Sequence, residues 1–63
     1  MFKETTVRIK GGMPVMVAGM VYPDVIEDLD IRWYNTGKRV TTRFARSISE
    51  SDMRLITEEL ARA

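Results

Sequence analysis

The sequence contains no cysteine and no histidine. Without cysteine the chain cannot form a disulfide, and without either residue it lacks the usual ligands of a structural zinc ion. The common nucleophile–base pairs of hydrolases need one of these residues too, and no serine lies in a nucleophile-elbow pattern. We therefore predict a non-enzymatic protein with no catalytic residues, no metal and no cofactor.

Long apolar runs are also missing. No segment approaches the roughly 18 apolar residues that span a membrane, and residues 1–6 lack the layout of a signal peptide. The absence of cysteine is compatible with a reducing compartment. The prediction is a soluble, cytoplasmic protein of one domain, residues 1–63, with no membrane partner and with a core that is small because the chain is short.

The net charge of +1 conceals a separation of charges along the chain. Residues 24–30 carry four acidic side chains and no basic one, whereas residues 31–49 carry five basic side chains and no acidic one. Such a molecule has a strong local field although its total charge is near zero. The acidic segment lacks the spacing of a calcium loop. We interpret it as a solvated loop or as a contact for a basic partner.

Two strands are indicated in the first third of the chain. Residues 5–10 alternate between polar and apolar and are rich in β-branched side chains. Residues 15–21 are apolar on both faces, so this second strand must be covered on both sides, by its own fold or by another chain. Met16 and Met20 share one of its faces, and the sequence leaves them open between a core and a subunit interface.

A hairpin is predicted over residues 29–34 and 39–44, with Gly37 supplying the positive φ of the turn. Placing Trp33 opposite Val40 collects the apolar side chains on one face of the pair. Trp33 is then an anchor of the core.

The other face of this hairpin is basic and aromatic: Arg32, Tyr34, Lys38, Arg39 and Arg43. Arginine beside an aromatic ring binds phosphates while a base stacks, so this face is a candidate for nucleic-acid or other partner binding. The alternative is an ordinary solvated face of a half-buried strand.

The last segment, residues 50–62, has the pattern of an amphipathic helix. Ser49 is the expected N-cap, with Asp52 three residues further on as in a capping box. The apolar stripe consists of Met53, Ile56 and Leu60.

Leu55 lies off that stripe and is available for another contact. Exposed contiguous apolar surface usually marks an interaction site, and two-fold dimers are the commonest way to cover it. We therefore expect a homodimer whose contacts include Met16, Met20 and Leu55.

The chain resembles the YodC-like family of small bacterial and prophage proteins (the DUF2158 domain) over about residues 7–48. The matching residues are Gly11, Gly12, Pro14, Met16, Trp33, Tyr34, Gly37, Lys38 and Phe44. The chain departs from the family at Met13, in the long acidic loop over residues 22–30, and in the helix after Glu50. The resemblance implies a strongly bent, SH3-like barrel and brings no established activity with it.

Taken together, these patterns predict a mostly β protein. Its fold is a small SH3-like barrel of four to five antiparallel strands over about residues 5–48, followed by a C-terminal helix over about residues 50–62. The predicted function is a non-enzymatic interaction module, bacterial or phage-borne, that binds a protein partner. The alternative is a nucleic-acid-binding protein that uses the basic face of the 31–44 hairpin.

Overall fold

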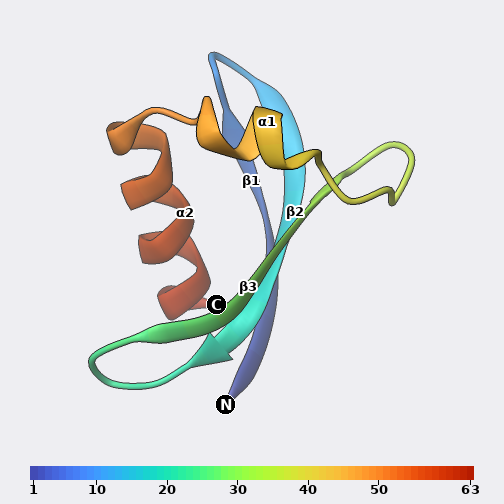
Figure 1. The fold of residues 1–63 in the computed structure, drawn as a ribbon. Helices are drawn as coiled ribbons and strands as arrows, with labels where there is room; N and C mark the ends of the chain where they lie inside the picture. The colour runs from blue at the N-terminus through green and yellow to red at the C-terminus, as the bar shows by residue number, and fades with distance from the viewer.

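Three antiparallel strands form an open sheet, and a C-terminal helix packs against one of its faces (Figure 1). The computed structural model describes all of residues 1–63; its elements are β1 Phe2–Ile9, β2 Met13–Val21, β3 Ile26–Trp33, α1 Thr42–Arg46 and α2 Glu50–Arg62. The sheet order is β1-β2-β3, so each strand pairs with its neighbour in sequence. The mostly β fold with a C-terminal helix is confirmed, but the sheet has three strands and is not closed into a barrel. Neither helix is long and apolar enough to cross a membrane.

The turn between β1 and β2 depends on its two glycines. Gly11 has a φ of 79° and Gly12 a φ of 137°, values that side-chain-bearing residues rarely adopt. The backbone N–H of Gly12 donates to the carbonyl oxygen of Ile9 at 3.0 Å and closes the turn. The predicted end of the first strand at this glycine pair is confirmed.

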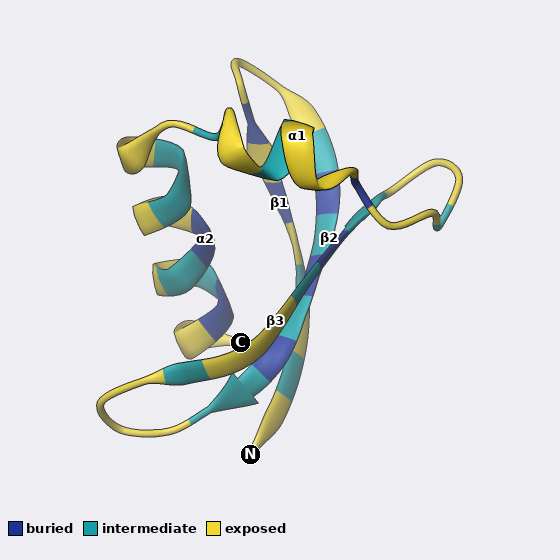
Figure 2. Ribbon diagram, in the orientation of Figure 1, coloured by how far each residue is buried: buried dark blue, intermediate teal, exposed yellow.

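The core lies between the inner face of the sheet and α2 (Figure 2). Val15 and Val17 of β2 and Ile56 and Leu60 of α2 are completely buried. Each such side chain contributes about 1.5 to 3 kcal/mol on burial. The remaining core residues come from β1, β3 and the segment after the hairpin turn: Val7, Ile9, Ile31 and Val40.

Gly19 allows close packing in the middle of this arrangement. A Cβ atom at Gly19 would lie 3.1 Å from Cγ2 of Ile26 and 3.5 Å from Cδ2 of Leu60. A larger residue here would push α2 and the start of β3 away from β2.

Polar contacts attach both ends of α2 to β1 or to the turn that follows it. The hydroxyl of Ser49 accepts a hydrogen bond from the backbone N–H of Asp52 at 3.1 Å, which confirms the predicted N-cap. The carboxylate of Asp52 accepts from the backbone N–H of Lys10 at 2.9 Å. At the other end, Nζ of Lys3 donates to the carbonyl oxygen of Ala61 at 2.9 Å. These contacts therefore hold both ends of the helix against the sheet.

The fourth strand predicted over residues 39–44 is wrong. Only one bridge forms, between Arg32 and Arg39, and the chain then turns into α1. The hydroxyl of Thr41 accepts from the backbone N–H of Phe44 at 3.1 Å, so a threonine that favours strands acts as a helix N-cap.

The predicted pairing of Trp33 with Val40 is wrong by two residues. Instead, the backbone N–H of Trp33 donates to the carbonyl oxygen of Lys38 at 2.9 Å, and the backbone N–H of Val40 donates to the carbonyl oxygen of Ile31 at 3.0 Å. Because side chains alternate with a period of two, this slip leaves the predicted inward residues on the inner side. The positive φ predicted at Gly37 is confirmed at 73°.

Candidate functional site

The outer face of the sheet, opposite α2, is not covered by either helix (Figure 1). Met16, Ala18 and Met20 alternate with the inward valines of β2 and form an apolar column along the middle of this face. Phe2 on β1 lies opposite Met20 and is 62% exposed. The two methionines, which the sequence left open between core and interface, are half-buried and lie outside the core.

Charged residues border this apolar column on both sides. On β1, Glu4 lies opposite Ala18, and Arg8 lies further along the strand. On β3, Asp30 lies opposite Ala18, and Arg32 lies opposite Met16. The outer face is thus an apolar strip in a charged frame, which is the composition of a protein-binding surface.

Asp30 joins two arginines at the edge of the outer face. Its Oδ2 accepts from Nε of Arg32 at 2.8 Å, and its Oδ1 accepts from Nε of Arg39 at 2.8 Å. The hydrogen bond from Arg32 lowers the pKa of Asp30, and burial opposes it. The charge of Arg32 and the hydrogen bond and charge of Arg39 lower that pKa further. One of the two positive charges is therefore neutralised locally.

We expect Asp30→Asn to cost about 1 kcal/mol or less near neutral pH, since these groups are partly solvated. The folded pKa of Asp30 lies below the unfolded value, so the stabilisation is present above roughly pH 4 and is lost as the pH falls through the folded pKa. Urea unfolding of both proteins across this range measures the difference. The free energies of unfolding of the wild type and Asp30→Asn should converge in acid. A difference that stays equally large at low pH would show that the ionised carboxylate of Asp30 is not its cause.

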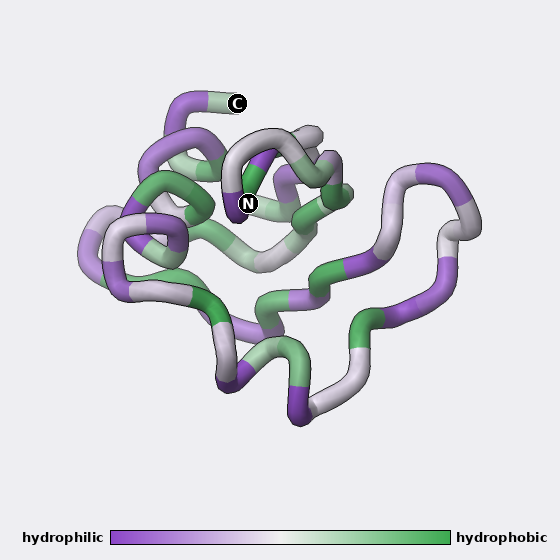
Figure 3. The backbone as a smooth tube through the Cα atoms, turned by 90° about the horizontal axis from the view of Figure 1, so that it is seen from above, coloured by the Kyte–Doolittle hydropathy of each residue, from purple (hydrophilic) through white to green (hydrophobic).

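The other residues of the predicted basic, aromatic face do not share one strand face. Tyr34, 57% exposed, and Lys38 belong to the polar turn after β3, which projects from the body of the molecule (Figure 1, Figure 3). Arg43 lies on α1, a different element. The structure therefore brings Arg32 and Arg39 together on Asp30 and places Arg43 apart from that group.

Leu55 is separated from the two methionines with which it was predicted to form a dimer contact. It lies on α2, is 37% exposed, and belongs to the helix that packs on the inner face. Met16 and Met20 lie on the outer face. A single isologous surface that includes both methionines therefore excludes Leu55.

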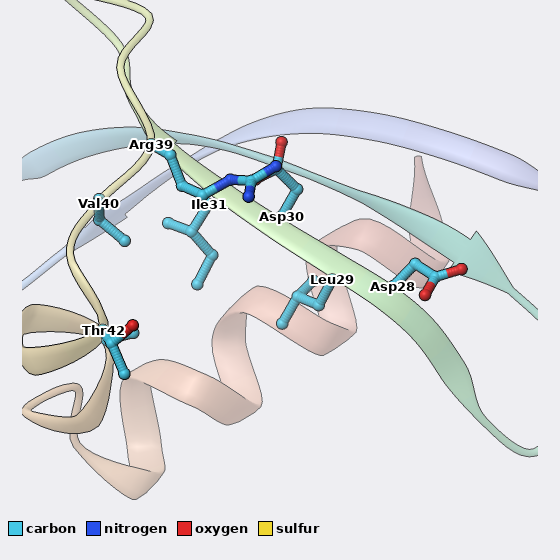
Figure 4. Close-up of a pocket in the computed structure, with 8 residues that line it drawn as sticks. Asp28, Leu29, Asp30, Ile31, Arg39, Val40 and Thr42 are labelled. Atoms are coloured by element: carbon cyan, nitrogen blue, oxygen red, sulfur yellow. The ribbon is translucent and has the colours of Figure 1, made fainter.

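A second candidate surface, which the sequence did not indicate, is a groove beside β3. The cavity has a volume of about 410 Å³ and opens between β3 and the segment that leads into α1. Figure 4 shows Leu29 and Ile31 of β3 on one side of it and Val40 and Thr42 on the other. The groove exists because the chain leaves β3 after Val40 instead of continuing as a strand.

Comparisons of this chain with protein-family models, curated proteins and solved structures find no match. The resemblance to the YodC-like family stays a prediction. The acidic residues of the 24–30 segment do not gather into a group of three that could hold a metal ion. The candidate sites are thus the outer face and the groove beside β3.

Proposed function

We propose that this protein is a cytoplasmic, non-enzymatic interaction module that forms a homodimer and binds a protein partner. The observation that carries the proposal is the uncovered outer face, with its apolar column of Met16, Ala18 and Met20. Methionine side chains adapt to the shape of a partner, and an apolar strip of this kind gains free energy when water is excluded from it.

The small core favours a second copy of the chain as one partner that covers the outer face. Only nine of the 63 residues are buried, so the monomer obtains little stabilisation from its interior. Two sheets can pack face to face about 10 Å apart with their strands nearly aligned. A two-fold axis parallel to the strands would place β1 of one copy over β3 of the other without a shift along the strands. Because Glu4 and Asp30 both lie opposite Ala18, Glu4 would then face Asp30 and the two arginines that it binds.

We also propose that the chain belongs to the YodC-like family and shares the SH3-like barrel of that family. A three-stranded, antiparallel meander would form the open half of an SH3-like barrel, and the missing part would be supplied by a further strand. Strand order and the position of the glycine turn support this relationship.

Met16→Glu tests the dimer. In sedimentation velocity over about a hundredfold concentration range, the wild-type chain of 7.3 kDa should shift toward dimer mass as its concentration rises. Met16→Glu should remain at monomer mass, because burying an unpaired carboxylate in an apolar contact is costly. Leu55→Glu is the matched control and should associate like the wild type. A wild-type protein at monomer mass throughout, or equal loss in both variants, would refute a dimer through the outer face.

Nucleic-acid binding is the second candidate, favoured by the exposed Tyr34 and Lys38 beside Arg32 and Arg39. Asp30 opposes it, because this carboxylate already occupies both arginines. Fluorescence anisotropy with labelled single- and double-stranded oligonucleotides at low salt separates the two candidates. Binding that falls steeply with salt and weakens in Arg39→Ala would support the nucleic-acid alternative. Absence of binding at tens of micromolar leaves the protein partner.

A further inference from the structure

We infer that the free edge of β3 and the groove beside it bind an extended peptide segment of alternating basic and apolar residues, which adds to the sheet as a fourth strand. This inference rests on the proposed function as a protein-binding module and specifies the chemistry of the partner. Three independent features carry it: an incompletely paired strand edge, an apolar groove along that edge, and acidic side chains without basic partners.

The edge of β3 is paired only at its end. Its last hydrogen bonds on the free side join Trp33 to Lys38 and Val40 to Ile31. Beyond Val40 the chain enters the cap of α1, and no strand lies beside the rest of β3. Backbone groups alternate in direction along a strand, so Leu29, two residues before Ile31, also directs its N–H and carbonyl to the free side. Such groups are the template on which an added strand forms.

A bulge sets the length of this edge. The pairing of β2 with β3 shifts between Ala18–Asp30 and Met20–Glu27, and Asp28 has a φ of 56°. Bulges interrupt ladder pairing. The regular edge therefore runs from Leu29 to Ile31 and would give an added strand about three backbone hydrogen bonds. The partner segment is accordingly short.

The groove provides contacts for the apolar side chains of the added strand. Leu29, which is 37% exposed, and the largely buried Ile31 lie on the β3 side, and the largely buried Val40 lies across from them (Figure 4). Ala45 of α1 lines the other end. Because alternate side chains of a strand point to the same side, every second residue of the partner would be apolar.

Charge decides between possible occupants of this edge. Asp24, Glu27 and Asp28 are exposed and form no ion pair, whereas Asp30 is the one acid of this segment that meets arginines. A second copy pairing antiparallel through its own Leu29–Ile31 edge would place the two Asp30 carboxylates opposite each other, which is unfavourable. A segment with a lysine or arginine beside Glu27 and Asp28, at the bulge before the regular edge, would instead neutralise these carboxylates.

A second hollow, near the start of β3, is also lined in part by acidic side chains. It has a volume of about 450 Å³ and lies between the β2–β3 loop and α2, lined by Asp24, Ile26 and Glu58 among others. A basic side chain at the end of the added strand would find carboxylates here as well.

The test uses fluorescein-labelled six-residue peptides and the full chain. The probe alternates lysine and valine; its controls alternate glutamate and valine, or carry N-methyl groups that remove the backbone donors on one edge. Only the lysine–valine peptide should bind, and NMR spectra of the ¹⁵N-labelled protein should shift at the amides of Leu29 and Ile31. Binding of the N-methylated peptide with equal affinity, or amide shifts centred on Met16 and Met20, would overturn strand addition at β3.

The double variant Glu27→Gln, Asp28→Asn tests the charge requirement. Asparagine accepts the positive φ of position 28, so the bulge should persist. Loss of two exposed ion pairs should weaken binding by about threefold to tenfold. Glu4→Gln, which removes one negative charge from β1, should leave the affinity unchanged. Equal affinity in all three proteins would refute the charge complementarity.

Failure of this inference can be distinguished from failure of the proposed function. The dimer is tested at Met16 on the outer face, whereas the peptide is tested at the edge of β3. A protein that dimerises but does not bind the lysine–valine peptide at millimolar concentration refutes strand addition and leaves the interaction module intact. A monomer that binds the peptide at Leu29 and Ile31 supports strand addition and refutes the dimer.

Discussion

Leu60→Ala is expected to destabilise the protein by about 2 to 5 kcal/mol. Leu60 is completely buried between α2 and the sheet, close to the position of Gly19, and its removal would leave a cavity that the neighbouring β-strands cannot easily fill. A domain of this size has only a few kcal/mol of total stability. The variant should therefore lose most of its stability and be largely unfolded at 37 °C.

Leu55→Ala is the matched control for this prediction. It makes the same change in the same helix, with the same difference in helix propensity, but at a side chain that is 37% exposed. We expect a change within about 0.5 kcal/mol. Urea unfolding followed by far-UV circular dichroism measures both variants. Equal costs at the two positions would mean that α2 does not pack on the sheet through Leu60.

The first half of the sheet and the C-terminal helix follow from local signals in the sequence. The glycine pair at 11–12 predicts a turn, and the residues on either side of it predict two strands, which the structure has at Phe2–Ile9 and Met13–Val21. Ser49 is an effective cap, and the stripe of α2 contains the two side chains that prove to be fully buried. In each of these elements, propensity, capping and burial favour the same structure.

The segment after the hairpin could not be predicted in this way because two signals conflict. Valine and threonine at residues 40–42 favour a strand, but Thr41 is also a good helix N-cap. Phe44 could reach the core from either backbone. The contact of its ring with Trp33 is compatible with a helix, and the cap then decides the outcome.

The two candidate surfaces can be predicted only in part from the sequence. The alternation in β2 predicts Met16 and Met20 as a second apolar face, but the sequence does not show which side α2 covers. The contact of Asp30 with both arginines requires the Arg32–Arg39 bridge, which the predicted register did not contain. The groove beside β3 exists only because the chain departs from the strand after Val40.

Trp33→Ala is expected to cost about 3 kcal/mol, near the lower end for a tryptophan because the side chain is only half-buried. The indole meets the ring of Phe44 edge-on, with 4.6 Å between the ring centroids. Nζ of Lys10 lies 4.8 Å from the centroid of the same phenylalanine ring. The three groups connect β3, α1 and the turn after β1. Removing the indole should therefore loosen α1 as well as destabilise the whole fold.

Two further variants test whether the contact between Trp33 and Phe44 is the reason why Trp33→Ala loses stability. Trp33→Phe keeps an aromatic ring beside Phe44 and should recover about half of the lost stability. Tyr34→Ala removes the adjacent aromatic side chain, which is 57% exposed, and should change stability by about 0.5 kcal/mol or less. Urea unfolding by far-UV circular dichroism suits all of these proteins, since Trp33 is the only tryptophan and fluorescence would be lost with it. If Trp33→Ala unfolds at the same urea concentration as Tyr34→Ala, Trp33 is a surface residue. The position of α1 against the sheet would then depend on Val40 and on the cap at Thr41.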